Sequence, residues 1–222
     1  ITDNGKGIPK DEIRTAFMRH ATSKIDSFED LENVLTLGFR GEALSSIASV
    51  AQVEMLTRTE NDSMGTRIVI NGGVVDREEE CAANVGTVFY VKNIFFNTPA
   101  RRKFLKKPAT EGSYISEIVN RIALGHPNIA IKYINNGNIV LQTNGDGNVK
   151  NSLFYIYGKD IASKMLNLES EKEGYILKGL VGKPELSRGN RNYENFFING
   201  RFIKSTLVQN AVEDAYKNKI MI

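Results

Sequence analysis

Cysteine is scarce in this chain of 222 residues, because Cys81 is the only one. A single cysteine excludes an internal disulfide framework and any metal site built from several cysteines, and it fits a reducing, cytosolic setting. No apolar run approaches the length of a membrane span, and no signal-peptide pattern, repeat or low-complexity linker occurs. With 41% hydrophobic and 25% charged residues, the sequence is that of a globular protein with one large domain or two small ones.

An initiator methionine is also missing, since the chain opens on Ile1-Thr2-Asp3-Asn4. This opening is typical of the end of a buried strand, so we expect a piece of a longer protein. The net charge of +3 permits nucleic-acid binding without arguing for it. Basic residues gather at one place: Arg101, Arg102, Lys103, Lys106 and Lys107. Such a run fits either a solvated face or a patch that contacts phosphates.

The first of two glycine motifs is Asp3-Asn4-Gly5-Lys6-Gly7-Ile8. Two glycines one residue apart permit tight turns and the close approach of a ligand. The Asp3 carboxylate can accept a hydrogen bond from an exocyclic amine such as that of adenine. By itself, the motif favours a surface turn over a binding site.

The second glycine motif, Gly38-Phe39-Arg40-Gly41-Glu42-Ala43-Leu44, leads into an expected helix. Unpaired N–H groups and the positive end of the helix dipole meet at such a start. The motif therefore predicts an anion site or a plain helix cap, and Arg40 favours the anion site. Between the two motifs, Thr22-Ser23-Lys24 offers hydroxyl groups and a charge to phosphates. Neither a Walker A loop nor a dinucleotide-binding fingerprint occurs.

Hydrophobic periodicity predicts an α+β protein in two parts, 1–146 and 147–222, with the polar stretch 144–148 as their boundary. Helices are expected over residues 9–19, 42–51, 111–125 and 205–218. Strands are expected over residues 52–59, 66–76, 174–182 and 194–199, around Val88 and Tyr90, and in a hairpin over 129–143. Ile115, Ile118 and Ile122 should share the apolar face of the third helix, and His126 should cap its end.

In their order and spacing, the glycine motifs and His20-Ala21-Thr22-Ser23-Lys24 between them resemble the MutL family of DNA mismatch repair ATPases. Two later segments strengthen the resemblance, the run from Asn97 to Leu105 (NTPARRKFL) and the run from Phe197 to Arg201 (FINGR). The resemblance spans nearly the whole chain. It implies a GHKL-type (Bergerat) ATPase α/β sandwich over 1–146 and a ribosomal S5-like α/β domain over 147–222, each of them incomplete.

The resemblance also implies roles for single residues. The nucleotide-binding set comprises Asp3, Gly5, Gly7 and Thr87 at the adenine end, Thr22, Ser23 and Lys24 in the ATP lid, and Arg40, Gly41 and Glu42 at the phosphate-binding turn. Arg201 lies where the family carries a DNA-contacting arginine, and Arg101 and Arg102 are expected at the domain junction as further DNA contacts. Phosphate contacts of this kind support sequence-independent DNA binding.

By resemblance, the complete protein binds ATP with Mg²⁺, hydrolyses it slowly and forms a homodimer of its N-terminal region on ATP binding. The implied partners are DNA and a MutS-type mismatch sensor, whose signal is coupled to strand incision. The implied location is the bacterial cytoplasm, with nucleoid association during repair and no membrane.

Three family residues do not occur in this chain: the general-base glutamate, the magnesium-holding asparagine and the sensor lysine. No catalytic or metal-ligating residue is therefore assigned, and we expect the isolated chain to lack ATPase activity. Two alternatives remain. A non-catalytic DNA-binding or interaction module would keep the same fold, and another ATPase of the superfamily is disfavoured by the segments 38–44 and 97–105.

Overall fold

The computed structural model describes residues 1–19 and 41–219, which form two compact units, Ile1–Leu105 and Lys106–Ile222. Each unit is described by itself. Within the described residues, no helix is both long and apolar enough to span a membrane.

The first unit is built on a five-stranded antiparallel sheet with the strand order β1-β5-β2-β3-β4. Its strands are β1 (Thr2–Asp3), β2 (Gln52–Arg58), β3 (Gly65–Asn71), β4 (Val74–Cys81) and β5 (Gly86–Lys92). Its helices are η1 (Lys10–Glu12), α1 (Ile13–Ala16), α3 (Ala43–Ala48) and α4 (Pro99–Arg102). Because β1 pairs with β5, residues 2–3 lie beside residues 87–88, which are far away in the sequence.

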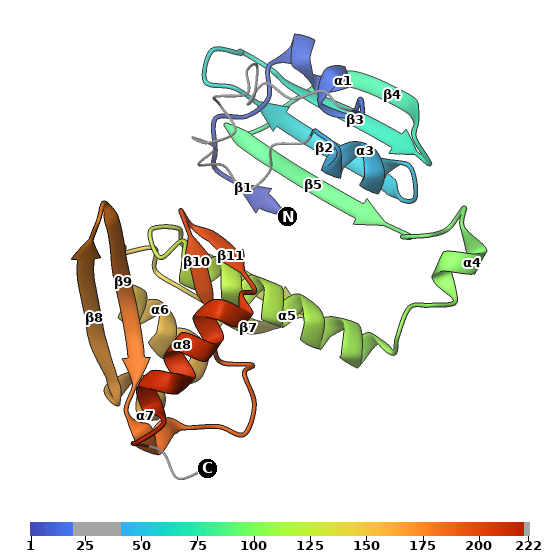
Figure 1. Ribbon diagram of the computed structural model, residues 1–222. Helices are drawn as coiled ribbons and strands as arrows, with labels where there is room; N and C mark the ends of the chain where they lie inside the picture. Colours follow the sequence, from blue (N-terminus) through green and yellow to red (C-terminus); the bar gives the residue numbers. More distant parts are fainter. Residues whose placement is uncertain (20–40, 220–222) are drawn as a thin grey trace. The chain divides into compact units, whose positions relative to one another are not determined.

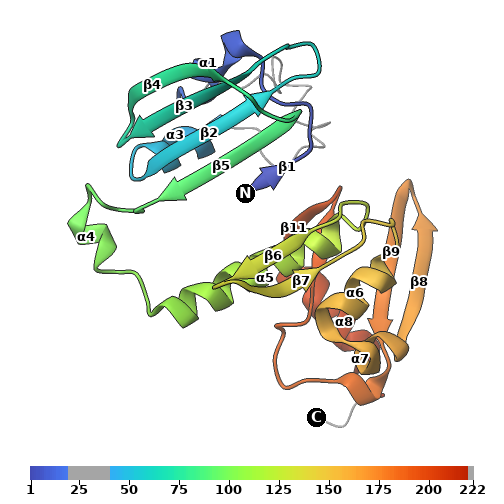
Figure 2. The ribbon, with the colours of Figure 1, turned by 180° about the vertical axis from the view of Figure 1, so that it is seen from behind.

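The core of the first unit lies between one face of this sheet and the helices α1 and α3 (Figures 1 and 2). Alternate residues of β2 and β3 point into it, among them Met55 and Ile68, which are fully buried. Ile13 of α1 and Ala48 of α3 cover them from the other side. Burial of one such isoleucine stabilises the fold by about 1.5–3 kcal/mol. The alternation in the sequence therefore decides which face of the sheet the helices cover.

The second unit combines helices with three separate antiparallel hairpins. In chain order its elements are α5 (Pro108–Gly125), β6 (Lys132–Asn135), β7 (Asn138–Gln142), α6 (Val149–Tyr157), α7 (Lys159–Ser163), β8 (Met165–Lys172), β9 (Tyr175–Gly182), η2 (Pro184–Leu186), β10 (Phe196–Ile198), β11 (Arg201–Ile203) and α8 (Thr206–Tyr216). Leu124, Leu153 and Ala162 form its buried core, with Met165 and Phe197 packed against them.

All four expected helices occur. Two are shorter than expected: the segment 9–19 contains only the brief helices η1 and α1, and the segment 42–51 contains α3. The expected strands occur too, except that the segment 66–76 is divided by a turn after Asn71 into β3 and the start of β4. Asn136-Gly137 forms the turn of the β6–β7 hairpin with positive φ angles. The helices α6 and α7 and the strand β8 were not expected. His126 caps α5, as predicted.

The apolar face predicted for α5 is largely exposed. Ile115 and Ile118 are 49% and 55% exposed, whereas the buried residues of the helix are Ala123 and Leu124. The helix itself occurs as predicted, but its apolar face is not covered within this unit. The last turn of α5 supplies its buried residues, because Leu124 packs in the core of this unit and Gly125 lies against Phe197 of β10.

The compact units divide between Leu105 and Lys106, not at the polar stretch 144–148. That stretch is held within the second unit by hydrogen bonds. The Gly147 N–H donates to the carbonyl of Pro127 at 3.0 Å, and the Asn148 side chain accepts from the Lys150 N–H as the N-cap of α6. Turn-forming residues here begin a helix and do not separate two bodies.

Candidate nucleotide-binding site

A row of polar residues crosses the first sheet at one end of its helix-covered face. The strand registers pair Asp3 with Thr87, Thr87 with Thr57, and Thr57 with Thr66. The three threonines are buried, while Asp3 is exposed. Because directly paired residues point to the same side of a sheet, these four side chains form one line along the end of the apolar core.

Asp3 is held by two backbone N–H groups. Its Oδ1 atom accepts hydrogen bonds from the Gly5 N–H at 2.9 Å and from the Thr87 N–H at 3.2 Å. Within residues 1–19 and 41–219, no hydrogen bond reaches Oδ2. The carboxylate is thus fixed in direction, with one oxygen left to accept a donor from a ligand. This arrangement brings together Asp3, Gly5 and Thr87, which the sequence had assigned to the same site.

Two glycines allow close backbone approaches here, Gly7 between the glycine loop and the end of β2 and Gly86 between β5 and β1. Gly7 has φ +74°, and a Cβ atom there would lie 2.1 Å from the carbonyl oxygen of Arg58. Gly86 has φ +115°, and its Cβ would lie 2.3 Å from the carbonyl oxygen of Asp3. Side chains are excluded at both places by backbone conformation and by space. Gly86 was not a predicted site residue, although its position before Thr87 gave a signal.

Thr57 was also missed from the sequence. Its side chain is 1% exposed, and its hydroxyl joins the glycine loop to β5. The Ile8 N–H donates to Thr57 Oγ1 at 2.9 Å, and the carbonyl oxygen of Gly86 and the hydroxyl of Thr87 each lie 3.1 Å from the same atom. The available signal in the sequence was a threonine on the inward face of β2, whose other inward residues, Val53 and Met55, are apolar.

The predicted phosphate-binding end lies only partly within the described residues. Thr22, Ser23, Lys24 and Arg40 lie outside the described residues. Gly41 has φ +63°, and Glu42 is the N-cap residue of α3, so the glycine motif does run into a helix start as predicted. The Ser45 hydroxyl donates to the Glu42 carbonyl at 3.0 Å and stabilises this turn. Phosphate binding at Gly41 and Glu42 stays a prediction.

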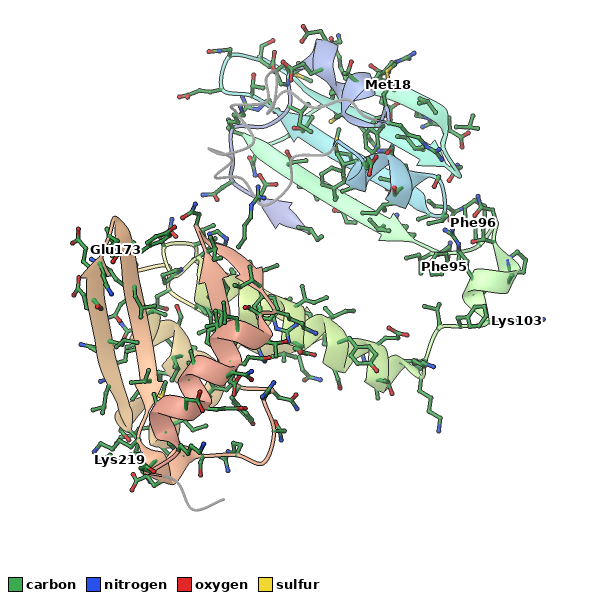
Figure 3. All side chains as sticks on the ribbon, in the orientation of Figure 1. Met18, Phe95, Phe96, Lys103, Glu173 and Lys219 are labelled. Atoms are coloured by element: carbon green, nitrogen blue, oxygen red, sulfur yellow. The ribbon has the colours of Figure 1, made fainter. Side chains whose placement is uncertain are left out.

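The three predicted DNA-contacting arginines fall in different units. Arg101 and Arg102 are exposed on α4 of the first unit, where the next residue, Lys103, points away from the ribbon (Figure 3). Arg201 opens β11 in the second unit and pairs with Ile198 across the tight Asn199-Gly200 turn.

The hairpin that carries Arg201 is seated on the end of α5. The Arg121 guanidinium lies 4.2 Å from the ring centroid of Phe202, a cation–π contact. Phe197 and Phe202 pack edge to face at 5.9 Å. A Cβ at Gly125 would lie 2.7 Å from the Phe197 ring, so the helix backbone touches the hairpin directly. The position of Arg201 therefore depends on aromatic packing.

Comparison with known proteins identifies relatives over the whole chain. It is 53% identical over 221 residues to the DNA mismatch repair protein MutL of Agathobacter rectalis and 48% identical over 220 residues to that of Lactobacillus delbrueckii subsp. bulgaricus. These matches cover 100% and 99% of this chain, which spans 34% of the length of each relative. Residues 153–222 match the family model described as the DNA mismatch repair protein, C-terminal domain.

The fold agrees with these relatives. The solved Aquifex aeolicus MutL ATPase domain complexed with ADP superposes with a TM-score of 0.72 at 25% identity, over 96% of this chain and 73% of that one. The α+β architecture is accordingly that of a GHKL-type ATPase sandwich followed by a ribosomal S5-like domain. Because sequence identity extends over the whole chain and the fold agrees, this chain belongs to the MutL family of DNA mismatch repair proteins.

Proposed function

We propose that this chain carries the adenine side of an ATP site and part of a DNA-binding surface. In the longer protein, ATP binding drives dimerisation of the N-terminal region and slow hydrolysis follows. That protein binds DNA and couples mismatch recognition by a MutS-type partner to strand incision. The relative solved with ADP supports nucleotide binding, because its fold extends over 96% of this chain.

The observation that carries the proposal is the fixed carboxylate of Asp3. Gly5 and Thr87 hold Oδ1 through their N–H groups, which leaves Oδ2 to accept the exocyclic N–H of adenine. A carboxylate whose direction is already set loses little freedom on binding, so its hydrogen bond contributes more to affinity. Gly5 leaves room beside the carboxylate, because a Cβ atom there would lie 3.0 Å from Asp3 Oδ1.

At the phosphate end, we propose contacts from Thr22, Ser23 and Lys24 of a lid and from Arg40, Gly41 and Glu42 of the turn before α3. Hydroxyl groups, cationic side chains and backbone N–H groups suit phosphate oxygens. Among the described residues, no group of three His, Cys, Asp or Glu side chains is arranged to hold a metal ion. The magnesium ion of the complete protein is therefore assigned to no residue here.

For DNA, we propose Arg201 as a phosphate contact, with Arg101 and Arg102 as further contacts. Arginine binds phosphate through a planar set of N–H donors, and each such contact releases counterions from DNA. The exposed positions of Arg101 and Arg102 and the defined hairpin under Arg201 support these roles.

We further propose that residues 1–146 correspond to the ATPase domain of the family and residues 147–222 to its second domain. The family model, which begins its match at residue 153, supports this assignment. The compact units divide earlier, so α5 and the β6–β7 hairpin would belong to the ATPase domain by descent while packing with the second unit here.

The test is direct binding of ADP and ATP to the purified chain, measured by calorimetry. The wild-type chain should bind, and Asp3→Ala should lower affinity by about tenfold or more, because a charge-assisted hydrogen bond is lost. Asp11→Ala, an exposed acid of η1, is the matched control and should leave affinity unchanged. Equal binding by wild type and Asp3→Ala would reject the site. Retained DNA binding without any nucleotide binding would favour the non-catalytic module.

A further inference from the structure

The Thr57 hydroxyl has three polar neighbours and one proton. It lies 2.9 Å from the Ile8 nitrogen, 3.1 Å from the Gly86 carbonyl oxygen and 3.1 Å from the Thr87 hydroxyl oxygen. Thr57 is 1% exposed and Thr87 is 6% exposed. Competition from water for these bonds is therefore slight, and the group must be satisfied internally.

One arrangement of protons satisfies all three contacts. The Ile8 N–H can only donate, so it uses one lone pair of Thr57 Oγ1. The Gly86 carbonyl can only accept, so it takes the single proton of Thr57. The contact between the two hydroxyl groups must then be a bond donated by Thr87 to the remaining lone pair of Thr57. The proton of Thr87 consequently points toward Thr57, and its oxygen keeps only acceptor capacity for other partners.

This polarity matters because Thr87 lies beside the proposed adenine contact. Asp3 and Thr87 are direct partners in the β1–β5 register, and the Thr87 N–H holds the Asp3 carboxylate. A carboxylate and an acceptor-only hydroxyl together suit a group that donates twice. The 6-amino group of adenine has two N–H donors, whereas the 6-oxo group of hypoxanthine has none and would face acceptors alone.

We propose that Thr57 is a positioning residue for base selection. By binding the Thr87 proton, it makes Thr87 a second acceptor beside Asp3, so that the site takes a 6-amino purine and rejects a 6-oxo purine. This inference rests on the proposed nucleotide function. Thr57 itself touches no ligand and acts through Thr87 and through the glycine loop that it holds at Ile8.

The experiment compares ADP with inosine diphosphate by calorimetry on the whole chain. Thr57→Val keeps the shape of the side chain and removes its hydroxyl, which frees the Thr87 proton to donate to a 6-oxo group. Thr57→Ser keeps the hydroxyl. Thr66→Val makes the same substitution on the same buried face, one strand farther from β5, where the side chain is 5% exposed.

The wild-type chain should prefer ADP by about tenfold or more, since a site with unpaired buried acceptors disfavours the analogue. Thr57→Val should weaken ADP binding and reduce this preference at least about threefold. Thr57→Ser and Thr66→Val should keep the wild-type preference. A purely structural role for Thr57 predicts equal weakening of both nucleotides, so an unchanged preference in a folded Thr57→Val chain overturns the inference.

A second measurement applies whether or not Thr57→Val folds. N6-methyl ADP offers one N–H in place of two, so the wild-type chain should bind it more weakly than ADP. Equal affinity for the two overturns the inference but leaves the proposed function intact. If the wild-type chain binds no ADP at all, the proposed function fails and the inference fails with it.

Discussion

The two units differ in what fixes their candidate functional residues. In the first unit, Asp3, Thr87 and Thr57 are aligned by backbone pairing across three strands of one sheet. In the second unit, Arg201 lies on a hairpin of two three-residue strands whose position depends on side-chain packing against α5. Pairing in a sheet fixes a side chain through many cooperative hydrogen bonds. The position of the packed hairpin, in contrast, is held by only a few aromatic contacts.

The two units also differ in how much of their hydrophobic core is buried. The first unit buries residues from two helices and two neighbouring strands in one continuous cluster. The second buries few large side chains and leaves others, such as Tyr175 and Ile176 of β9, 80% and 63% exposed. A substitution that disturbs backbone register in the first unit should therefore cost more than one that disturbs packing in the second.

The largest effect is expected for Gly86→Ala. The new Cβ would lie 2.3 Å from the Asp3 carbonyl oxygen at φ +115°, so β1 must separate from β5. We expect the free energy of unfolding to fall by about 3 kcal/mol or more, with loss of ADP binding. Chemical denaturation measures the first effect and calorimetry the second.

The control is Gly174→Ala, at the β8–β9 turn of the second unit. Its φ is +81°, but nothing lies within 4 Å of the added Cβ. Only the left-handed conformation opposes this substitution, at a cost of about 1–2 kcal/mol. If both substitutions lowered the free energy of unfolding equally, the close approach of β1 and β5 would contribute nothing beyond the backbone conformation of the glycine.

A smaller loss is expected for Gly125→Ala, which tests the packed seat of the Arg201 hairpin. The Cβ would meet the Phe197 ring at 2.7 Å, and Phe197 is held by Phe202 and the core. Overpacking of this kind destabilises by about 1–3 kcal/mol. Gly112→Ala on the same helix would meet only the side-chain amide of Asn135 and should stabilise α5 by up to about 1 kcal/mol. Thermal unfolding of the two variants should shift in opposite directions.

Arg201→Ala should weaken DNA binding, and because Arg201 is half-buried in β11, thermal unfolding checks that the variant still folds. Loss of one phosphate contact should weaken binding equally for different sequences and reduce the slope of log K against log salt by about 1. Fluorescence anisotropy at several salt concentrations measures this slope. Lys150→Ala removes an equal charge from an exposed position of the same unit and should leave the slope unchanged. A slope that falls equally in both variants would indicate a general charge effect.

The smallest effect is expected on the surface of the first sheet. Hydrogen bonds from Arg67 and Lys92 lower the pKa of Glu54 from its ordinary value of 4.5. A lowered pKa in the folded state adds stability that is present above pH 4.5 and lost as the pH falls through the folded-state pKa. Glu54→Gln should therefore cost less than about 1 kcal/mol at pH 7. In denaturation curves, the difference from wild type should vanish in strong acid, and persistence there would contradict this cause.

The sequence predicted the elements well where periodicity was strong. β2, β3, the Asn136-Gly137 turn and α8 lie within a few residues of their expected positions. The exposure of the apolar face of α5 could not be predicted, because periodicity shows which residues share a face and not what covers that face. β8 was missed because its second half, Glu169 to Lys172, is polar and exposed, so no alternation of buried apolar residues marks it as a strand.

For the site, the motif alone was sufficient to name Asp3, Gly5 and Gly7, since an acid beside closely spaced glycines is visible in a linear sequence, whereas Thr87 was named through the resemblance to the family. The resemblance to the family gave those residues their roles. Thr57 and Gly86 became visible only in the folded sheet. A buried threonine has no distinctive neighbours in sequence, and its importance comes from hydroxyl partners 29 to 49 positions away.

By itself, the sequence determined the family, the fold class and the residue types at the proposed adenine end. Local chemistry sufficed for this, because glycine spacing and an acidic side chain are properties of short segments. Only the tertiary structure decided that Asp3 is held by Thr87, that Gly86 must lack a side chain and that Thr57 sets the direction of the Thr87 proton. These features depend on strand pairing over more than 80 residues, for which no short segment carries the information.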